Sequence, residues 1–523
     1  MIYDWARIQA ELHPETIAVT SEEGHLSYAS LESESNKLAG LLLKFGLQKG
    51  DRVGLLLANS PENIIATHGI SKAGGIAVPV DIANPENRIA HVLSASDVSF
   101  MVIDQQGISK YRNLIQQNKN LDSAPWIWWS TQICGLNDQR SPAFSKQDVS
   151  HQPDYPFQKV RDENFPAYIY FESGEGNYPK GITFTHKNIA SIVEWALEYF
   201  QPKPADRITG FAQLSAALSV FDVYTTFAAG SHLYLAPVQN EINPLQHYNF
   251  ILENDITQWF ADTSMLTYLA RFDLLEHQGL PGLKRLLWHG KNLQMSSLNY
   301  WLKQLPKTSF TNLYGPNQTI LAGHYSIPET LKPGMEIPIG KPCTGQKLHV
   351  LNSEFKPVPT GFIGDLYVSG EALSKGYWKD EKSSKIAFKW FLNENKEWER
   401  VVYTGDLASC NVDGIFYYHG WADYKVKKKT NRTDLKEIEA ALGSLKNLKE
   451  FAVVPVSVKG EKVFGCAYVS EQDFLVIPPA LKNQLSKTVP GHMLPNFWKS
   501  FTKLPRKKNG KIDRKQLSKE FSE

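Results

Sequence analysis

The chain has 523 residues, of which 42% are hydrophobic and 21% are charged, and its formal net charge is +2. A chain of this length is too long for one compact core, which predicts two or more domains. The near-neutral charge argues against a nucleic-acid partner, and no apolar run approaches the length of a membrane span. The four cysteines are scattered without CxxC spacing, which argues against a disulfide framework and against a zinc site.

The first hundred residues alternate between strand and helix patterns. The N-terminus MIYDWARIQAELHPET carries early charges and no apolar h-region, so we expect no signal peptide and a cytoplasmic location. Residues 26–57 predict a short strand, an amphipathic helix and a buried strand, because leucines recur there at helical spacing. Residues 63–81 predict a helix, a Gly-Gly break and a strand, and residues 98–104 predict another buried strand. Strands that alternate with helices predict parallel α/β layers.

The later part of the chain predicts further subdomains. Residues 104–162 look irregular, and strand-like segments resume at residues 167–174, 232–237, 256–262, 283–290 and 309–315. From about Gly340, glycine turns separate alternating strands, which predicts a small β subdomain. A helix over 434–445 and strands over 450–458 and 462–470 predict a compact C-terminal part. We therefore expect an α/β core domain of residues 1–422 (layered α/β subdomains plus the β subdomain) and a small α+β domain of residues 423–523.

A glycine-rich loop stands in YFESGEGNYPKGITFTHKNI, residues 170–189. A phosphate cradle needs glycines so that backbone N–H groups can approach oxygen, and it gains from a cation and a following helix N-terminus. Gly174, Gly176, Gly181 and Lys180 meet that description. The pattern is not GxxxxGK[ST], so the loop alone is equally compatible with a surface turn.

The order of seven further motifs indicates the family. In chain order they are SKAGGIAVPVD from Ser71, LYGPNQT from Leu313, GDLYVSGEALSKGYW from Gly364, YTGDL from Tyr403, GWADYKVKKKTNRTDLKEIEAAL from Gly420, VPGHMLP from Val489 and LPRKKNGKIDRKQL from Leu504. Over nearly its whole length the chain resembles the adenylate-forming superfamily, which contains the acyl-CoA synthetases and the adenylation domains of nonribosomal peptide synthetases. Because of NGKIDRKQL, it is most similar to a stand-alone adenylation domain of the carrier-loading branch.

The resemblance implies a two-step reaction. A carboxylic acid attacks the α-phosphate of ATP, with Mg²⁺ as cofactor, and forms an acyl-adenylate and pyrophosphate. The phosphopantetheine thiol of an acyl or peptidyl carrier protein then takes the acyl group. The C-terminal domain is expected to be mobile and to swing about a hinge at Asp423. No permanently bound cofactor, no nucleic acid and no membrane is expected.

Several residues match positions that have roles in that superfamily. Lys511 matches the catalytic lysine that contacts the carboxylate and the phosphate, where a cation suits the developing charge. Asp406 matches the aspartate that accepts hydrogen bonds from the ribose, and Tyr314 and Gly315 match the adenine-stacking segment. The plainer alternatives are a surface lysine, a turn aspartate and a strand-end turn. The full set of expected nucleotide-binding residues is Ser173, Gly174, Lys180, Tyr314, Gly315 and Asp406.

Other positions depart from the superfamily pattern. Glu172 and Glu175 replace hydroxyl residues of the phosphate loop, and like charges about 4 Å apart cost on the order of 4 kcal/mol at an effective dielectric constant near 20. Such a cost weakens triphosphate binding roughly a thousandfold. Gln318 replaces the glutamate expected to bind Mg²⁺, which prefers charged oxygen. The complete set of departures is Glu172, Glu175, Asn317, Gln318, Trp421 (in place of a ribose-binding arginine) and Thr430 (in place of a glycine).

An alternative use of the two loop glutamates stays open. The site lacks a carboxylate at Gln318 and has two in the loop, so Glu172 or Glu175 could hold the metal from the other side. On that hypothesis Glu175→Ser abolishes magnesium-dependent ATP binding, and otherwise it leaves the binding unchanged or improves it. The sequence therefore assigns no metal ligand.

The acid pocket is expected to be apolar. LSAALSVFDVYTTFAAGSHLYL, residues 214–235, matches the segment whose aspartate pairs with the substrate ammonium in amino-acid-activating members, and Ala217 stands at that position. Because a buried charge needs a partner, a free α-ammonium is disfavoured, and an aryl, keto or aliphatic acid fits better. The expected lining is Ala217, Leu218, Phe221, Phe260, Leu287, His289, Leu313, Leu321 and Ala322. His289 either contacts a polar substituent or is an ordinary strand-end histidine, and a further alternative is that apolar side chains fill a pocket that binds nothing.

Two functions stay open at this stage. The first is a ligase that activates an acid as acyl-AMP and loads a carrier protein, and it rests on Lys511, Asp406, Lys180 and the motif order. The second is a pseudoenzyme that serves as a scaffold or carrier-binding partner, and it rests on the departures from the superfamily pattern. Nucleic-acid binding through the C-terminal lysines is a minor third alternative.

Overall fold

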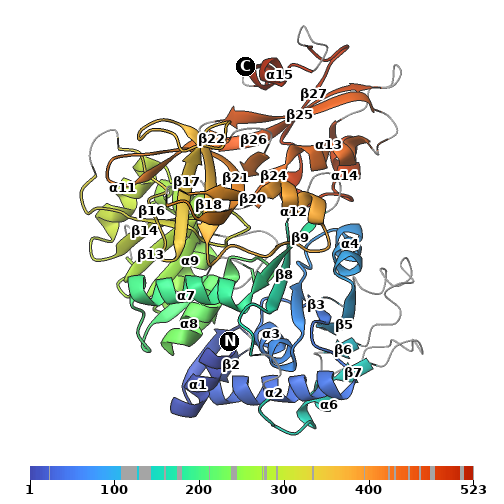
Figure 1. Ribbon diagram of the computed structural model, residues 1–523, viewed down its shortest axis with the longest axis vertical. Coiled ribbons are helices and arrows are strands. Elements are labelled where there is room, and N and C mark those ends of the chain that lie inside the picture. Colours follow the sequence, from blue (N-terminus) through green and yellow to red (C-terminus); the bar gives the residue numbers. More distant parts are fainter. Residues whose placement is uncertain are drawn as a thin grey trace. The chain divides into compact units, whose positions relative to one another are not determined.

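The computed structural model of the chain forms two compact units (Figure 1). The first unit comprises Met1–Ile82, Leu93–Tyr170 and Gly181–Gly420, and the second comprises Ala83–Val92, Phe171–Lys180 and Trp421–Glu523. The structure describes residues 1–22, 24–105, 107, 126–128, 143–157, 161–172, 179–210, 213–236, 244–273, 275, 279–289, 293–331, 335–393, 395–421, 425–428, 431–443, 445, 448–458, 461–470, 478–506 and 512–521. Within these ranges, no helix is both long and apolar enough to cross a membrane.

An eight-stranded sheet has the order β19-β9-β8-β4-β3-β5-β6-β7. Its strand β3 pairs in parallel with β4 and β5, and β4 pairs in parallel with β8. Almost all residues of β3 and β4 are buried, as parallel strands covered on both faces require. The strands are β3 (Arg52–Leu56), β4 (Ile76–Pro79), β5 (Val98–Ile103), β6 (Trp126–Trp128), β7 (Ala143–Ser145), β8 (Pro166–Glu172), β9 (Lys180–Thr185) and β19 (Gly376–Tyr377). The helices in this part of the chain are α1 (Asp4–Leu12), α2 (Tyr28–Lys44), α3 (Pro61–Ala73), α4 (Glu86–Ser96) and α6 (Lys146–Ser150).

A nine-stranded sheet has the order β16-β15-β14-β13-β12-β10-β11-β1-β2. Its central strands run in parallel, and β15 and β2 are antiparallel to their neighbours. The strands are β1 (Ile17–Ser21), β2 (Gly24–Ser27), β10 (Arg207–Gly210), β11 (His232–Leu235), β12 (Gln258–Asp262), β13 (Arg285–His289), β14 (Ser309–Tyr314), β15 (Gly323–Ser326) and β16 (Lys341–Pro342). The helices between them are α7 (His186–Phe200), α8 (Ser219–Ala229), α9 (Pro244–Glu253), α10 (Thr263–Arg271) and α11 (Met295–Gln304).

Helix α3 lies between the two sheets. It contacts β1 of the nine-stranded sheet and β3 and β4 of the eight-stranded sheet. Every residue of α3 except Glu62 is buried, which is typical of a helix packed on all sides. The helix ends at Gly74, whose φ of 84° lies in the left-handed region that glycine adopts without strain.

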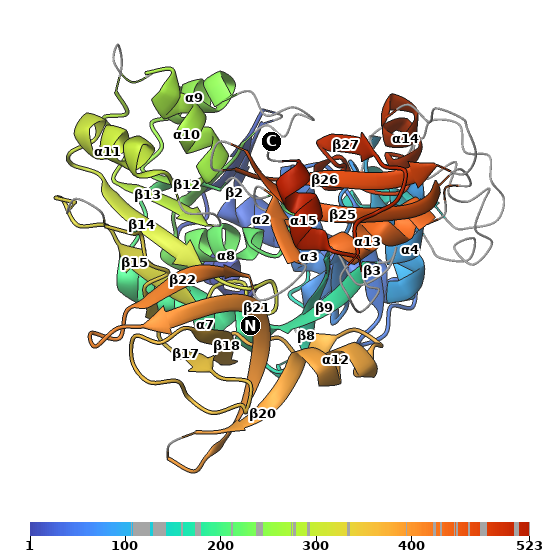
Figure 2. The same cartoon turned by 90° about the horizontal axis from the view of Figure 1, so that it is seen from above.

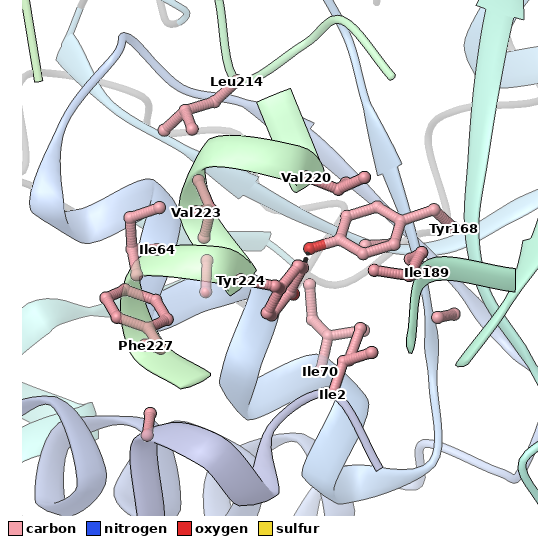
Figure 3. Close-up of a cluster of buried hydrophobic side chains, with 14 of the residues drawn as sticks. Ile2, Ile64, Ile70, Tyr168, Ile189, Leu214, Val220, Val223, Tyr224 and Phe227 are labelled. Atoms are coloured by element: carbon pink, nitrogen blue, oxygen red, sulfur yellow. Dashed lines mark hydrogen bonds between the residues drawn. The ribbon is translucent and has the colours of Figure 1, made fainter. Parts of the chain in front are cut away.

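A core of buried apolar side chains lies around α3 and α8 in the first unit (Figure 3). Val223, Tyr224 and Phe227 of α8 are buried there together with Ile64 of α3. The hydroxyl groups of Tyr224 and Tyr168 are 2.6 Å apart and share a hydrogen bond, so the polar ends of both buried rings are satisfied. Helices α7 and α8 lie side by side next to this core (Figure 1).

The β subdomain is a five-stranded sheet in which β17, β18, β21 and β20 follow one another and β22 pairs with β21 (Figure 2). All its described pairings are antiparallel. The elements are β17 (Gln346–Leu351), β18 (Gly364–Gly370), α12 (Glu381–Ala387), β20 (Phe388–Leu392), β21 (Trp398–Cys410) and β22 (Phe416–Trp421). The sheet carries Asp406 on β21, which is the expected ribose ligand.

The turn between β20 and β21 gives a first testable prediction. Lys396 is exposed and has a φ of 62°, a conformation that costs an L-residue roughly 1–2 kcal/mol and costs glycine little. We expect Lys396→Gly to raise the free energy of unfolding by about 1 kcal/mol in chemical denaturation. The neighbouring exposed Glu397 is the matched control, and Glu397→Gly should lower the free energy of unfolding. Equal effects of the two changes would contradict the strain at Lys396.

The C-terminal part of the second unit combines two small sheets with helices. Strands β25 and β26 form a long antiparallel pair, and β27 adds to β26 in parallel (Figure 2). Helix α13 and strands β25 and β26 share a core that includes Ile438, Val453 and Phe464. The elements are β23 (Lys425–Lys428), β24 (Asn431–Asp434), α13 (Leu435–Gly443), β25 (Leu448–Val458), β26 (Glu461–Ser470), α14 (Pro478–Leu485), the 3-10 turn Gly491–Met493, β27 (Phe497–Ser500) and α15 (Arg514–Glu520).

The expected α/β class is confirmed, including the layered sheets, the small β subdomain and the strand pair near the C-terminus. One expectation needs correction. Residues 104–162 are not irregular throughout, because β6, β7 and α6 lie there and extend the eight-stranded sheet. These elements have only three to five residues, too few to show a periodic pattern.

Candidate nucleotide and acid site

The expected phosphate loop connects two neighbouring strands of the eight-stranded sheet. Strand β8 ends at Glu172 and β9 begins at Lys180, and both side chains are half-buried. Ser173, Gly174 and Glu175 lie outside the described residues. The structure therefore shows only where the loop begins and ends, after Glu172 and before Lys180.

Tyr314 and Asp406 meet in a buried hydrogen bond. Tyr314 is the last residue of β14, and Asp406 lies in the middle of β21. The Tyr314 hydroxyl donates to Asp406 Oδ2 at 2.5 Å, and Asp406 is only 2% exposed. The backbone N–H of Asp406 donates to Thr404 Oγ1 at 3.0 Å. A carboxylate has about four lone-pair positions, so one bond from a tyrosine leaves acceptor capacity for a ribose hydroxyl.

The segment after Tyr314 turns back on itself. A Cβ atom at Gly315 would lie 2.3 Å from the Ile320 carbonyl oxygen, so only glycine fits there. Ile320 has a φ of 63°, which is rare for a β-branched residue and stores strain in this turn. His289 Nε2 lies 3.1 Å from the Gly315 carbonyl oxygen, and since a carbonyl can only accept, the imidazole donates. His289 therefore braces the segment that is expected to contact adenine.

Gln318 has a protein partner at the expected magnesium position. The side chain is 5% exposed, and its Nε2 donates to the Tyr377 hydroxyl at 3.0 Å. Its backbone carbonyl accepts from the N–H of Ser374 at 2.9 Å. Asn317 beside it is half-buried. An amide held in this way offers a metal ion an uncharged oxygen, which is a poor ligand for Mg²⁺.

Most of the expected acid pocket forms one apolar wall. Phe260 and Leu287 are cross-strand partners, as are His289 and Leu313, and alternate residues of a strand share a face. The Phe221 ring of α8 lies 5.7 Å from the Phe260 ring, so this face of the sheet looks toward α8. Phe221, Phe260, Leu287, Leu313 and Leu321 are buried in one cluster, and Ala217 and Leu218 pack against it.

Ala322 is the exception within the expected lining. It is fully buried, but it packs with Tyr314 and Leu348 in the cluster of the β subdomain. The N–H of Ala322 donates to the Tyr314 carbonyl oxygen at 2.7 Å, which holds Ala322 beside Tyr314. The sequence alone could not show that Ala322 and its neighbour Leu321 pack in different apolar clusters.

Helix α8, which carries Phe221 of the apolar wall, also carries the buried carboxyl group of Asp222. Asp222 is 3% exposed, and neither of its oxygen atoms has a hydrogen-bond partner among the described residues. Burial raises the pKa of this carboxyl well above its ordinary value. Burial therefore disfavours the charged form of Asp222, which makes it a poor source of the negative charge that Ala217 lacks.

The remaining expected site residues are not placed. Lys511, Asp423 and Thr430 lie outside the described residues, and so does the side chain of Trp421, the last residue of β22. Among the residues that the structure does describe, no group of three or more His, Cys, Asp or Glu side chains is placed to hold a metal ion.

Sequence patterns missed three side chains that the fold brings to the site. Tyr377 binds Gln318, and Trp195 and His324 extend the aromatic wall beside Phe221. His324 is the cross-strand partner of Leu313, which was expected in the pocket, so strand register could have identified it. Trp195 and Tyr377 carry no comparable signal, because they come from elements far away in the sequence.

The chain matches one family model and many known proteins. The family of AMP-binding enzymes matches residues 6–378. Among curated proteins, the chain is 30% identical over 97% of its length to tyrocidine synthase 1 of Brevibacillus parabrevis and 31% identical over 97% of its length to bacitracin synthase 3 of Bacillus licheniformis. It spans 44% of the first relative and 8% of the second, so it corresponds to a part of each.

Solved structures share the fold at lower identity. The adenylation domain AlmE of Vibrio cholerae, solved with glycyl-adenosine-5'-phosphate, has a TM-score of 0.83 and 21% identity, with 99% of this chain and 96% of that chain covered. NpsA-ThdA of Klebsiella oxytoca, an artificially fused adenylation and PCP di-domain, has a TM-score of 0.80 and 20% identity, with coverage of 95% and 93%.

Proposed function

This chain belongs to the family of AMP-binding enzymes, and we propose that it activates a carboxylic acid without an α-ammonium group as an acyl-adenylate and passes the acyl group to a carrier-protein thiol. The observation that carries the choice of acid is the apolar wall around Ala217. Phe221, Phe260 and Leu313 offer no charge, and burial raises the pKa of Asp222 on α8 and so disfavours its charged form. A substrate ammonium would be buried there without a partner, at a cost that an uncharged acyl group avoids.

Different residues of the chain have different roles in this reaction. Asp406 accepts ribose hydroxyls, and the turn that begins at Gly315 positions the adenine beside Tyr314. Lys180 and Lys511 supply the positive charge that offsets the phosphates during attack by the acid. Gln318 does not suit Mg²⁺, because its amide is turned to Tyr377 and carries no charge.

A carrier protein as the second substrate is supported by the solved relatives. NpsA-ThdA and PA1221 are both described as proteins that combine adenylation and PCP domains. The present chain matches 93% and 83% of those two chains, respectively. We therefore propose that its acceptor is the phosphopantetheine thiol of a carrier protein.

A second function is favoured by the contacts at Gln318 and Asp406. Both side chains are buried and held by tyrosines, Gln318 by Tyr377 and Asp406 by Tyr314. A site whose polar side chains are buried and bonded to neighbouring tyrosines is also what a pseudoenzyme would have, and such a protein would act as a scaffold or a carrier-binding partner.

Calorimetric titration with Mg-ATP tests which of the two functions holds. Binding at micromolar to sub-millimolar concentrations, followed by acid-dependent exchange of pyrophosphate into ATP, supports the ligase. The exchange should occur with aryl, keto or aliphatic acids and not with the matching α-amino acids. No heat of binding at millimolar ATP would contradict the ligase and support the pseudoenzyme.

Restoring a carboxylate at position 318 gives a second testable prediction. Gln318→Glu adds one negative charge where Mg²⁺ binds, so we expect the affinity for Mg-ATP to rise about tenfold. The measurement is the same titration with magnesium and with EDTA. Asn317→Asp, one residue earlier, is the matched control and should have a smaller effect. An unchanged affinity of Gln318→Glu would show that position 318 does not face the metal.

A further inference from the structure

Three cross-strand neighbours form a row on one face of the nine-stranded sheet. His289 of β13 is opposite Leu313 of β14, and Leu313 is opposite His324 of β15. Side chains directly opposite one another point to the same face. His324 therefore lies on the face that carries Leu313 and the rest of the apolar wall.

The aromatic rings of α7 and α8 continue this row. The His324 ring lies 5.2 Å from Trp195 and 4.4 Å from Tyr199, both on α7. Trp195 in turn lies 6.4 Å from Phe221, which lies 5.7 Å from Phe260. The rings of Phe260, Phe221, Trp195 and His324 thus follow one another beside the residues of the expected acid pocket, and flat aromatic groups pack well against such rings.

His324 brings two ring nitrogen atoms to this series of rings. Its Nδ1 atom is shielded from solvent and has no hydrogen-bond partner among the described residues. Burial and the nearby Lys341 lower the pKa of His324 to about 4, so the imidazole is neutral at physiological pH. A buried polar atom without a partner costs roughly 1–3 kcal/mol, and a ligand that supplies the partner recovers this cost.

We propose that His324 is a specificity-determining residue that hydrogen-bonds a hydroxyl group on the ring of an aromatic acid. The inference rests on the proposed function, because it places the acyl group against the wall formed by Phe221 and Leu313. It names the substrate class more narrowly, as hydroxyaryl acids instead of unsubstituted aryl or aliphatic acids.

A hydroxyl group suits this position for a chemical reason. A neutral imidazole carries one N–H donor and one acceptor nitrogen, and Nδ1 has either role depending on the tautomer. A hydroxyl group both donates and accepts, so it pairs with Nδ1 in either tautomer. A carboxylate or ammonium substituent would instead bring an uncompensated charge into the apolar pocket.

Binding and adenylation of matched acids test the proposal. The probes are two parent acids, 3-phenylpropanoate and benzoate, and the forms of each that carry one hydroxyl group at position 3 or 4 of the aromatic ring. Binding of each acid is measured by calorimetry without ATP, and adenylation is measured by pyrophosphate exchange. We expect at least one hydroxylated acid to bind about 10- to 100-fold more tightly than its parent acid.

Three variants separate recognition from folding. His324→Leu should bring the hydroxylated and parent acids to equal affinity without changing the KM for ATP. His324→Asn, whose amide can replace the hydrogen bond of Nδ1, should retain part of the preference. His151→Leu changes an exposed histidine and should leave the preference unchanged.

The outcomes distinguish this inference from the proposed function. Binding that depends on the ring hydroxyl and on His324, but without pyrophosphate exchange, would support the inference and contradict the ligase. Adenylation without a preference for the hydroxyl, or with a preference that survives in His324→Leu, would overturn the inference and leave the ligase intact. Failure of every hydroxylated acid to bind would also overturn the inference.

Discussion

Asp406→Asn should weaken the binding of Mg-ATP by about 10- to 100-fold. Hydrogen bonds to a charged acceptor contribute roughly 1.5–3 kcal/mol, and each 1.4 kcal/mol corresponds to about a factor of ten in affinity. Asp406 is buried on a strand and keeps its position through Thr404, so the amide should occupy the same place as the carboxylate. The measurement is calorimetric titration with Mg-ATP at constant ionic strength.

Tyr314→Phe is the matched control for this prediction. It removes the hydroxyl that donates to Asp406 Oδ2 and keeps the ring that is expected to stack on adenine. We expect the affinity for Mg-ATP to stay the same or to rise, because Oδ2 then becomes available to the ribose. Wild-type affinity in Asp406→Asn would contradict the ribose role of Asp406. A large loss of affinity in Tyr314→Phe would show that the tyrosine hydroxyl itself binds the nucleotide.

Asp222→Asn should remove a strong pH dependence of stability. Asp222 is buried without a described partner, and burial raises the pKa of its carboxyl well above its ordinary value. The native state therefore keeps the proton, whereas the unfolded chain loses it above about pH 4. Unfolding then releases a proton, so the free energy of unfolding falls by up to about 1.4 kcal/mol per pH unit from about pH 4 up to the folded pKa.

Chemical denaturation of both proteins between pH 4 and pH 8 measures this effect. We expect the difference in stability between Asp222→Asn and the wild type to shift in favour of the variant as the pH rises. Asp413 is exposed, and Asp413→Asn is the control that should show no such shift. A constant difference across this pH range would mean that Asp222 is already ionised in the native protein.

The family and the chemistry at single positions could be predicted from the sequence. Motif order identifies the adenylate-forming fold, because motifs such as LYGPNQT and YTGDL are local and keep their order. Residue type alone shows that Gln318 lacks a charge and that Ala217 cannot pair with an ammonium group. The strands and helices of the sheets were also predictable, because their apolar residues recur with the periods of strands and helices.

Contacts between distant segments could not be predicted in this way. Tyr314 and Asp406 are 92 residues apart, and their hydrogen bond exists because Tyr314 of β14 packs in the cluster that also holds Val402 and Ala408 of β21, the strand of Asp406. Gln318 and Tyr377 also come from separate segments, and Ala322 packs in one cluster with Leu348 of β17. None of these pairings leaves a periodic pattern in the sequence.

The sequence by itself thus determined the family, the expected reaction and the apolar nature of the acid pocket, since these depend on residue types in a fixed order. Only the tertiary structure decided which side chains meet. It places His324 beside Trp195, joins Asp406 to Tyr314 by a hydrogen bond, and buries Asp222, which raises the pKa of that carboxyl. The physical reason is that hydrogen bonding and desolvation depend on the atoms that surround a group, and sheet register and helix packing assemble those atoms from elements far apart in the chain.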